Sequence, residues 1–74
     1  MNKPNIHVIR KDQKWAVKRE NVNGYAATFD TEEDASIKGR ELAKEDEVDF
    51  FLHAEDGTVS LRDSYGHDSK NVAS

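Results

Sequence analysis

The 74-residue chain carries 11 Lys and Arg against 15 Asp and Glu, a formal net charge of −4, and it contains no Cys. Without Cys, disulfides and thiolate zinc sites are excluded, and no stretch of about 18 apolar residues is present that would span a membrane. A chain this short makes one domain with a thin core, which we place at residues 1–68, followed by a flexible tail at residues 69–74.

The N-terminal third predicts a β-hairpin and a short third strand. Residues 6–10 and 15–19 each alternate between the two faces of a strand, and the polar residues between them form a turn. Trp15 falls on the inward face of the second strand, which predicts a core position. A second turn at residues 21–24 contains an Asn-Gly pair, whose residues both accept positive φ, and residues 25–29 can form the third strand.

The next segment predicts a helix that begins after Thr31 and runs to about Asp46. Thr31 is suited to cap the helix, and the three acidic residues that follow it lie where the helix dipole favours negative charge. The stripe at helical spacing consists of Ala35, Gly39, Leu42 and Ala43. These residues are mostly small, so the helix can lie close to a sheet. Ile37 points away from the stripe and is either exposed or covered by a partner.

The C-terminal segment predicts a second hairpin. Residues 48–54 are the most apolar run, and an Asp-Gly turn signature joins them to a return strand at residues 58–62. Alternation predicts that Val48, Phe50 and Leu52 share one face and that Asp49, Phe51 and His53 share the other. On the return strand, we expect Val59 and Leu61 to face inward.

The order of hairpin, short strand, helix and hairpin predicts an α+β fold. Strands clustered around one helix are typical of a two-layer domain. We expect an antiparallel sheet of four to five strands with one helix packed on one face. The opposite face of that sheet has no helix to cover it.

Several short motifs occur together along the chain. They are His7-Val8, Trp15-Ala16-Val17-Lys18, Thr31 with Ala35, Arg40-Glu41-Leu42-Ala43, His53 before Asp56-Gly57, and Ser64-Tyr65-Gly66 followed by Asp68. In order and spacing they resemble the small bacterial domain-of-unknown-function family 2188, over about residues 6–68. The resemblance implies a small cytoplasmic protein of bacterial or phage origin and implies no activity.

Four positions depart from that family's pattern. Ser36 stands where a larger apolar residue is expected, and Gly39 stands where Ala is usual. Both lower the stability of the helix, Gly39 by about 1 kcal/mol relative to Ala. His67 and Ser69 interrupt an ending in which Pro commonly follows the Asp. We therefore expect the chain to differ from its family in helix packing and in the tail.

The charge is divided unevenly along the chain. Residues 1–29 hold six basic and two acidic side chains, a net charge of +4, whereas residues 30–74 hold five basic and thirteen acidic ones, a net charge of −8. The basic residues of the first hairpin are Arg10, Lys11, Lys14, Lys18 and Arg19. With Trp15 and Tyr25 nearby they are a candidate nucleic-acid surface; as a solvated edge they would instead protect the sheet from aggregation.

The face of the sheet away from the helix is a candidate for self-association. Ile9 and Phe51 point to this face, and a two-fold dimer that buried them would enlarge a thin core. The alternative is cover by long side chains such as that of Lys18. His7 and His53 share the face and would approach each other if their strands are neighbours. Two His and a carboxylate can bind a metal, but no ligand spacing supports one, so we expect local hydrogen bonds.

Two other clusters do not predict chemistry. Residues 64–68 contain Ser, His and Asp, but adjacent residues point in different directions and cannot form a catalytic triad, so we expect a closing turn. A second cluster is acidic and comprises Glu41, Glu45, Asp46, Glu47 and Asp49. These residues lie mostly on the predicted helix and lack the spacing of a calcium loop. We therefore expect no catalytic residue, no cofactor and no metal ligand.

Together these patterns predict a non-enzymatic accessory or protein-interaction module. We expect a homodimer or a protein partner that the sequence does not identify, and no membrane association. The three apolar residues among residues 6–9 are too few for a signal-peptide core, which favours a cytoplasmic location. The alternative function is weak nucleic-acid binding through the basic hairpin.

Overall fold

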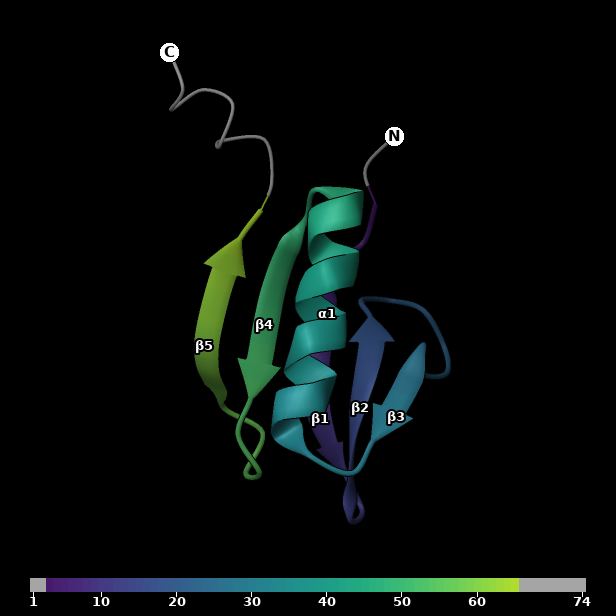
Figure 1. The fold of residues 1–74 in the computed structure, drawn as a ribbon, viewed down its shortest axis with the longest axis vertical. Coiled ribbons are helices and arrows are strands. Elements are labelled where there is room, and N and C mark those ends of the chain that lie inside the picture. The colour runs from purple at the N-terminus through teal and green to yellow at the C-terminus, as the bar shows by residue number, and fades with distance from the viewer. Residues whose placement is uncertain (1–2, 66–74) are drawn as a thin grey trace.

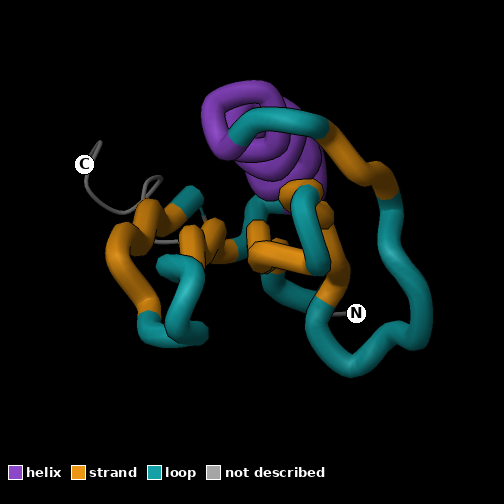
Figure 2. The backbone as a smooth tube through the Cα atoms, turned by 90° about the horizontal axis from the view of Figure 1, so that it is seen from below, coloured by secondary structure: helices purple, strands orange, loops and turns teal. Residues whose placement is uncertain are grey.

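Six elements follow one another along residues 3–65, the part of the chain that this computed structural model describes. They are β1 (Ile6–Lys11), β2 (Lys14–Arg19), β3 (Ala27–Phe29), α1 (Glu32–Asp46), β4 (Asp49–His53) and β5 (Val59–Ser64). The strands form one sheet in the order β3-β2-β1-β4-β5, and α1 crosses one face of it (Figure 1). Figure 2 shows the helix on one side of the strands. The predicted two-layer α+β architecture is confirmed.

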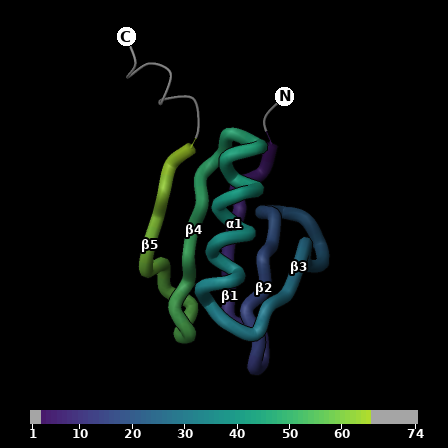
Figure 3. The backbone as a smooth tube through the Cα atoms, in the orientation of Figure 1, coloured from purple at the N-terminus to yellow at the C-terminus, as the bar shows by residue number. Residues whose placement is uncertain are grey.

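One pair of neighbouring strands departs from the predicted antiparallel sheet. β1 and β4 are parallel, with Ile6 opposite Phe50, whereas the other three pairs of strands are antiparallel. The chain leaves β3, runs along α1 and returns through β4 beside β1 (Figure 3). Parallel neighbours need a long crossover connection, and α1 supplies it. The sheet is therefore mixed rather than wholly antiparallel.

The ends of α1 follow the predicted signals. The Oγ1 atom of Thr31 accepts a hydrogen bond from the backbone N–H of Asp34 at 3.1 Å, which satisfies one of the free donors of the first turn. Glu47 ends the helix in the left-handed conformation, with a φ of 59°. Ile37 is 60% exposed on the outer side, the first of the two outcomes that the sequence allowed.

The helix lies close to the sheet at Gly39. A Cβ atom at this position would stand 2.7 Å from Cε1 of Phe50 and 3.0 Å from Cγ2 of Val8. Phe50 and Val8 are completely buried, so neither side chain has solvent to move into. The sequence marked Gly39 as a weakness of the helix. In the fold, its missing side chain is what allows the close contact.

The core extends from β2 to β4 and stops short of β5. Trp15 is 7% exposed and belongs to the core, as predicted. Within the described residues, the backbone of α1 lies near those of β1, β2, β3 and β4 but not near that of β5, which α1 reaches only through the long side chain of Arg40, 3.2 Å from Asp63. Leu61 lies opposite Leu52 on the helix side of the sheet, but Val59 and Leu61 are 53% and 37% exposed, so neither joins the core that the prediction of inward-facing residues implied. The single helix is too narrow to cover a five-stranded sheet.

The connection between β2 and β3 and the position of Ser64 also differ from the predictions. The Asn-Gly pair does not form a two-residue hairpin turn, because positive φ occurs at Asn21 (66°) and Gly24 (86°) within the longer connection between β2 and β3. The third strand is accordingly limited to Ala27–Phe29. Ser64 ends β5 rather than opening a turn. His67, Asp68 and the predicted tail at residues 69–74 lie outside the described residues.

Candidate functional site

The surface opposite α1, here called the open face, is formed by alternate residues of the central strands. Its members follow from the strand registers and the pleat of the sheet. They are His7, Ile9 and Lys11 of β1, Lys14, Ala16 and Lys18 of β2, Thr28 of β3, Asp49, Phe51 and His53 of β4, and Arg62 and Ser64 of β5. The centre of this face is apolar and aromatic, and its rim is charged.

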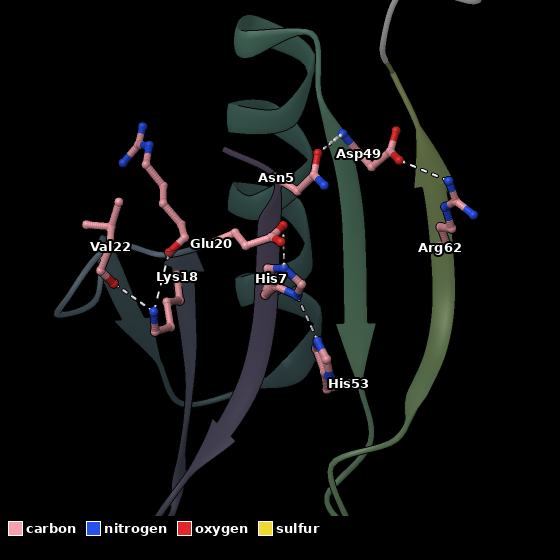
Figure 4. A network of polar contacts seen from close by, with 9 residues as sticks. Asn5, His7, Lys18, Glu20, Val22, Asp49, His53 and Arg62 are labelled. Carbon is pink, nitrogen blue, oxygen red and sulfur yellow. Dashed lines mark hydrogen bonds and ion pairs between the residues drawn. The ribbon is translucent and has the colours of Figure 1, made fainter. Parts of the chain in front are cut away.

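Two histidines meet on the open face. Nδ1 of His7 lies 2.9 Å from Nε2 of His53 (Figure 4). Nε2 of His7 lies 3.3 Å from Oε1 of Glu20, and Nδ1 of His53 lies 3.2 Å from the carbonyl oxygen of Gly57. The four groups make a continuous chain of hydrogen bonds, which we call the histidine chain. It exists because β1 and β4 are parallel neighbours, a pairing that the sequence prediction of an antiparallel sheet did not include.

Phe51 lies in the middle of this face and is half-buried. The imidazole of His7 stacks on its ring, with the centroids 4.9 Å apart and the planes 14° from parallel. The guanidinium of Arg62 stands 5.5 Å from the ring centroid and also donates to Asp49 at 3.0 Å. Ile9 is half-buried as well. The two apolar side chains are therefore partly covered by their own neighbours.

Lys18 does not provide the cover that the sequence suggested as an alternative for Phe51. Its ammonium donates to the carbonyl oxygen of Val22 at 2.7 Å and to that of Arg19 at 3.4 Å (Figure 4). The side chain is thereby held at the connection between β2 and β3. Cover of Phe51 comes instead from His7 and Arg62, one on each neighbouring strand.

The arrangement of the histidine chain does not form a metal site. Glu20 and His53 contact opposite nitrogens of His7, so the lone pairs of the three side chains do not converge on one point. A zinc site requires such convergence, with nitrogen ligands about 2.0–2.1 Å from the metal. Among the residues that the structure describes, no group of three His, Asp or Glu side chains is placed to hold a metal ion. The two histidines instead make hydrogen bonds to each other, to Glu20 and to Gly57.

The basic residues of the first hairpin do not form one surface. The registers place Arg10 and Arg19 on the helix side of the sheet, and Lys11, Lys14 and Lys18 on the open face. Arg10 donates to Glu55 at 2.9 Å and lies over the ring of Trp15, and Arg19 lies 3.8 Å from Asp46.

The lysines of the hairpin also have partners. Lys14 pairs with Asp30, and this hydrogen bond lowers the pKa of the Asp30 carboxyl below its ordinary value. The ammonium of Lys11 lies 4.0 Å from Asp12. These lysines are thus partly neutralised where they stand, and Lys18 is held by backbone carbonyls.

Glu20 is the member of the site that sequence reasoning missed. It follows the last residue of β2, and its backbone N–H donates to the carbonyl oxygen of Asn5 at 2.9 Å, which continues the β1–β2 pairing by one step. Continuing the alternation of Lys14, Ala16 and Lys18 would have placed Glu20 on the open face. That alternation is the signal in the sequence that could have found it.

The fold and the site define a small two-layer α+β domain with a histidine chain on an uncovered sheet face. No helix in the described part of the chain is long and apolar enough to cross a membrane. The chain belongs to the family DUF2188, an uncharacterised protein conserved in bacteria, whose sequence model matches residues 6–65. This confirms the resemblance drawn from the motifs. The chain matches no curated protein and no solved structure.

Proposed function

We propose that the protein is a non-enzymatic interaction module of the bacterial cytoplasm that forms a homodimer through the open face. The observation that carries this proposal is the pair of half-buried apolar residues, Ile9 and Phe51, on a sheet face that no other element of residues 3–65 covers. The absence of Cys fits a reducing compartment.

A second copy of the chain is the occupant that best fits this face. The domain has a single thin core on the helix side, so burial of the open face would give it a second apolar layer. A two-fold contact uses the same patch on both copies, and an apolar centre with a charged rim is the usual anatomy of such an interface. The rim carries both signs of charge, with Lys18 on the β2 side and the Asp49–Arg62 pair on the side of β4 and β5.

Sedimentation of the wild type and of Phe51→Thr at two concentrations tests this proposal. Thr is β-branched and keeps the strand, and loss of a central aromatic anchor of about 2 kcal/mol weakens association roughly 30-fold. Ile37→Ser is the matched control, because it removes an apolar residue that is 60% exposed on the other layer. The control should sediment as the wild type does. A wild type that is monomeric at both concentrations would contradict the proposal.

The alternative function is weak nucleic-acid binding. Its support is the shared position of Lys11, Lys14 and Lys18 on the open face. Against it stand the ion pairs of Lys14 and Arg10, which already neutralise part of this charge. Titration of labelled DNA and RNA at low and moderate salt decides the matter, because phosphate contacts are strongest at low salt. Absence of binding at low salt eliminates this alternative.

A further inference from the structure

The histidine chain ends at a hydrogen-bond acceptor on both sides. The carbonyl oxygen of Gly57 stands at one end and the carboxylate of Glu20 at the other, with the rings of His53 and His7 between them. A carbonyl oxygen and an ionised carboxylate only accept. The three hydrogen bonds therefore need three protons, all of which must sit on imidazole nitrogens. Two neutral imidazoles carry one N–H each, which leaves the chain one proton short.

The missing proton is the one for the hydrogen bond between the two imidazole rings. If each neutral imidazole donates outward, His53 to Gly57 and His7 to Glu20, the remaining nitrogens face each other as two lone pairs 2.9 Å apart. If both rings are protonated, two N–H groups face each other at the same distance. Only one additional proton, placed between Nδ1 of His7 and Nε2 of His53, completes all three bonds.

We propose that His7 and His53 bind one proton as a unit, and that the histidine chain is closed only over the range of pH in which the pair holds it. On either side of that range one of the three bonds must open. Two groups coupled in this way release their protons in two steps that belong to the pair and to neither residue alone.

The charged groups around the pair favour the single positive charge. Glu20, at the end of β2, lies directly against His7. The ring of Phe51 on β4 stacks on His7, and an aromatic face attracts a cation. Lys18 on β2 is held toward the carbonyl oxygen of Val22. On β4 and β5, Asp49 and Arg62 pair with each other, which offsets the charges of both. The helix lies on the opposite face of the sheet.

Opening of the histidine chain has a consequence for the open face. His7 is held against Phe51 by its bonds to Glu20 and His53, so release of either bond frees the imidazole to leave the ring uncovered. On the proposed function, dimerisation would then change over the same range of pH. This consequence alone depends on the dimer; the proton count does not.

The test is an NMR titration of the imidazole nitrogens in the wild type, in Glu20→Gln and in Glu45→Gln. Gln can donate an N–H to Nε2 of His7, so in Glu20→Gln the chain closes with both rings neutral. His7 should then change from the Nε2–H to the Nδ1–H tautomer, and closure should no longer require the extra proton. Glu45→Gln makes the same change of charge on α1 and should behave as the wild type does.

In the wild type, the first proton taken up should shift the nitrogens of both rings together, and the second should follow in a separate step. Independent titration of the two rings, or a Glu20→Gln variant that titrates as the wild type does, would overturn the proposal. Zinc added to chelator-treated protein is the further arm. Zinc that binds both rings would show that a metal, rather than a proton, joins them. Sedimentation of the wild-type sample used for the titration separates the two proposals, because a wild type that is monomeric and still titrates in two coupled steps contradicts only the dimer.

Discussion

Gly39 is the residue of α1 that faces Phe50 and Val8 across the core. As an isolated helix residue, Gly is worse than Ala by about 1 kcal/mol. In the fold, the place of its missing Cβ lies 2.7 Å from a ring carbon of Phe50. Protein interiors are close-packed and respond to added volume with strain. The cost of adding a Cβ atom at Gly39 therefore exceeds the gain in helix propensity.

We expect Gly39→Ala to destabilise the protein by about 1–2 kcal/mol, because an overpacking cost of about 1–3 kcal/mol exceeds the gain in helix propensity. The midpoint of urea unfolding measures the effect. Glu45→Ala, on the exposed side of the same helix, is the control and should change stability by less than about 0.5 kcal/mol. A Gly39→Ala protein more stable than the wild type would show that the close contact relaxes without cost.

Trp15 is a second residue whose surroundings determine how much a substitution destabilises the protein. It is 7% exposed, packs in the core, and carries the guanidinium of Arg10 at 5.3 Å from its ring. Trp15→Ala should cost about 3–5 kcal/mol, most of the stability of a domain this small, and circular dichroism should show an unfolded or barely folded chain. Trp15→Phe, which keeps most of the apolar volume, should remain folded. A folded Trp15→Ala protein that no longer binds nucleic acid would favour the alternative function.

At the scale of elements, hydrogen bonds to the carboxylate of Asp56 stabilise the connection between β4 and β5. The oxygen Oδ1 of Asp56 accepts from the backbone N–H of Thr58 at 3.1 Å and from its hydroxyl at 2.8 Å. These hydrogen bonds lower the pKa of Asp56 below its ordinary value. The same connection supplies the carbonyl oxygen of Gly57 to the histidine chain. The connection between β4 and β5 therefore contains both the turn at Asp56 and one end of the histidine chain.

Stability should fall as the pH drops through the acidic range, and Asp56 should contribute to the fall. A carboxyl whose pKa is lower in the folded than in the unfolded state stabilises the fold above its unfolded value, and that contribution is lost as pH falls through the folded value. In Asp56→Asn, the part of the pH dependence of stability that Asp56 contributes should disappear, whereas Glu45→Gln should keep it. Urea unfolding at a series of pH values provides the measurement, and identical profiles for Asp56→Asn and wild type would contradict the assignment.

At the scale of the whole molecule, basic residues of the first hairpin form ion pairs with acidic residues from the rest of the chain. Three basic residues of the first hairpin, Arg10, Lys14 and Arg19, meet carboxylates from the acidic remainder of the chain, Glu55, Asp30 and Asp46. Such surface pairs contribute little stability each. Their effect is on function, since they reduce the free positive charge that a nucleic acid would need.

Within residues 3–65 the sheet is covered on one face only, by α1, and this determines the behaviour expected of the whole protein. If the open face is buried in a dimer, the folded state is coupled to association, and the melting temperature should rise with protein concentration. Phe51→Thr should abolish this dependence, and Ile37→Ser should retain it. Differential scanning calorimetry over a wide range of concentration measures the effect, and a wild-type melting temperature independent of concentration would contradict it.

Local patterns in the sequence specify the elements and most of their inner and outer faces. The cap at Thr31, the alternation around Phe50 and Phe51 and the small stripe that contains Gly39 are local patterns, and each is specified by residues a few positions apart. The extent of the core was less predictable: Val59 and Leu61 have the right alternation, but the reach of one helix decides whether they are covered.

Which strands become neighbours depends on how the whole chain folds. His7 and His53 are separated by the whole of β2, β3 and α1, and no periodicity within a strand indicates its partner in a sheet. The crossover through α1 places β4 parallel to β1, and this pairing brings the two imidazoles to 2.9 Å and Glu20 to the far side of His7. Local patterns are read from neighbours in the chain, whereas the histidine chain depends on contacts between distant segments, which exist only once the sheet has formed.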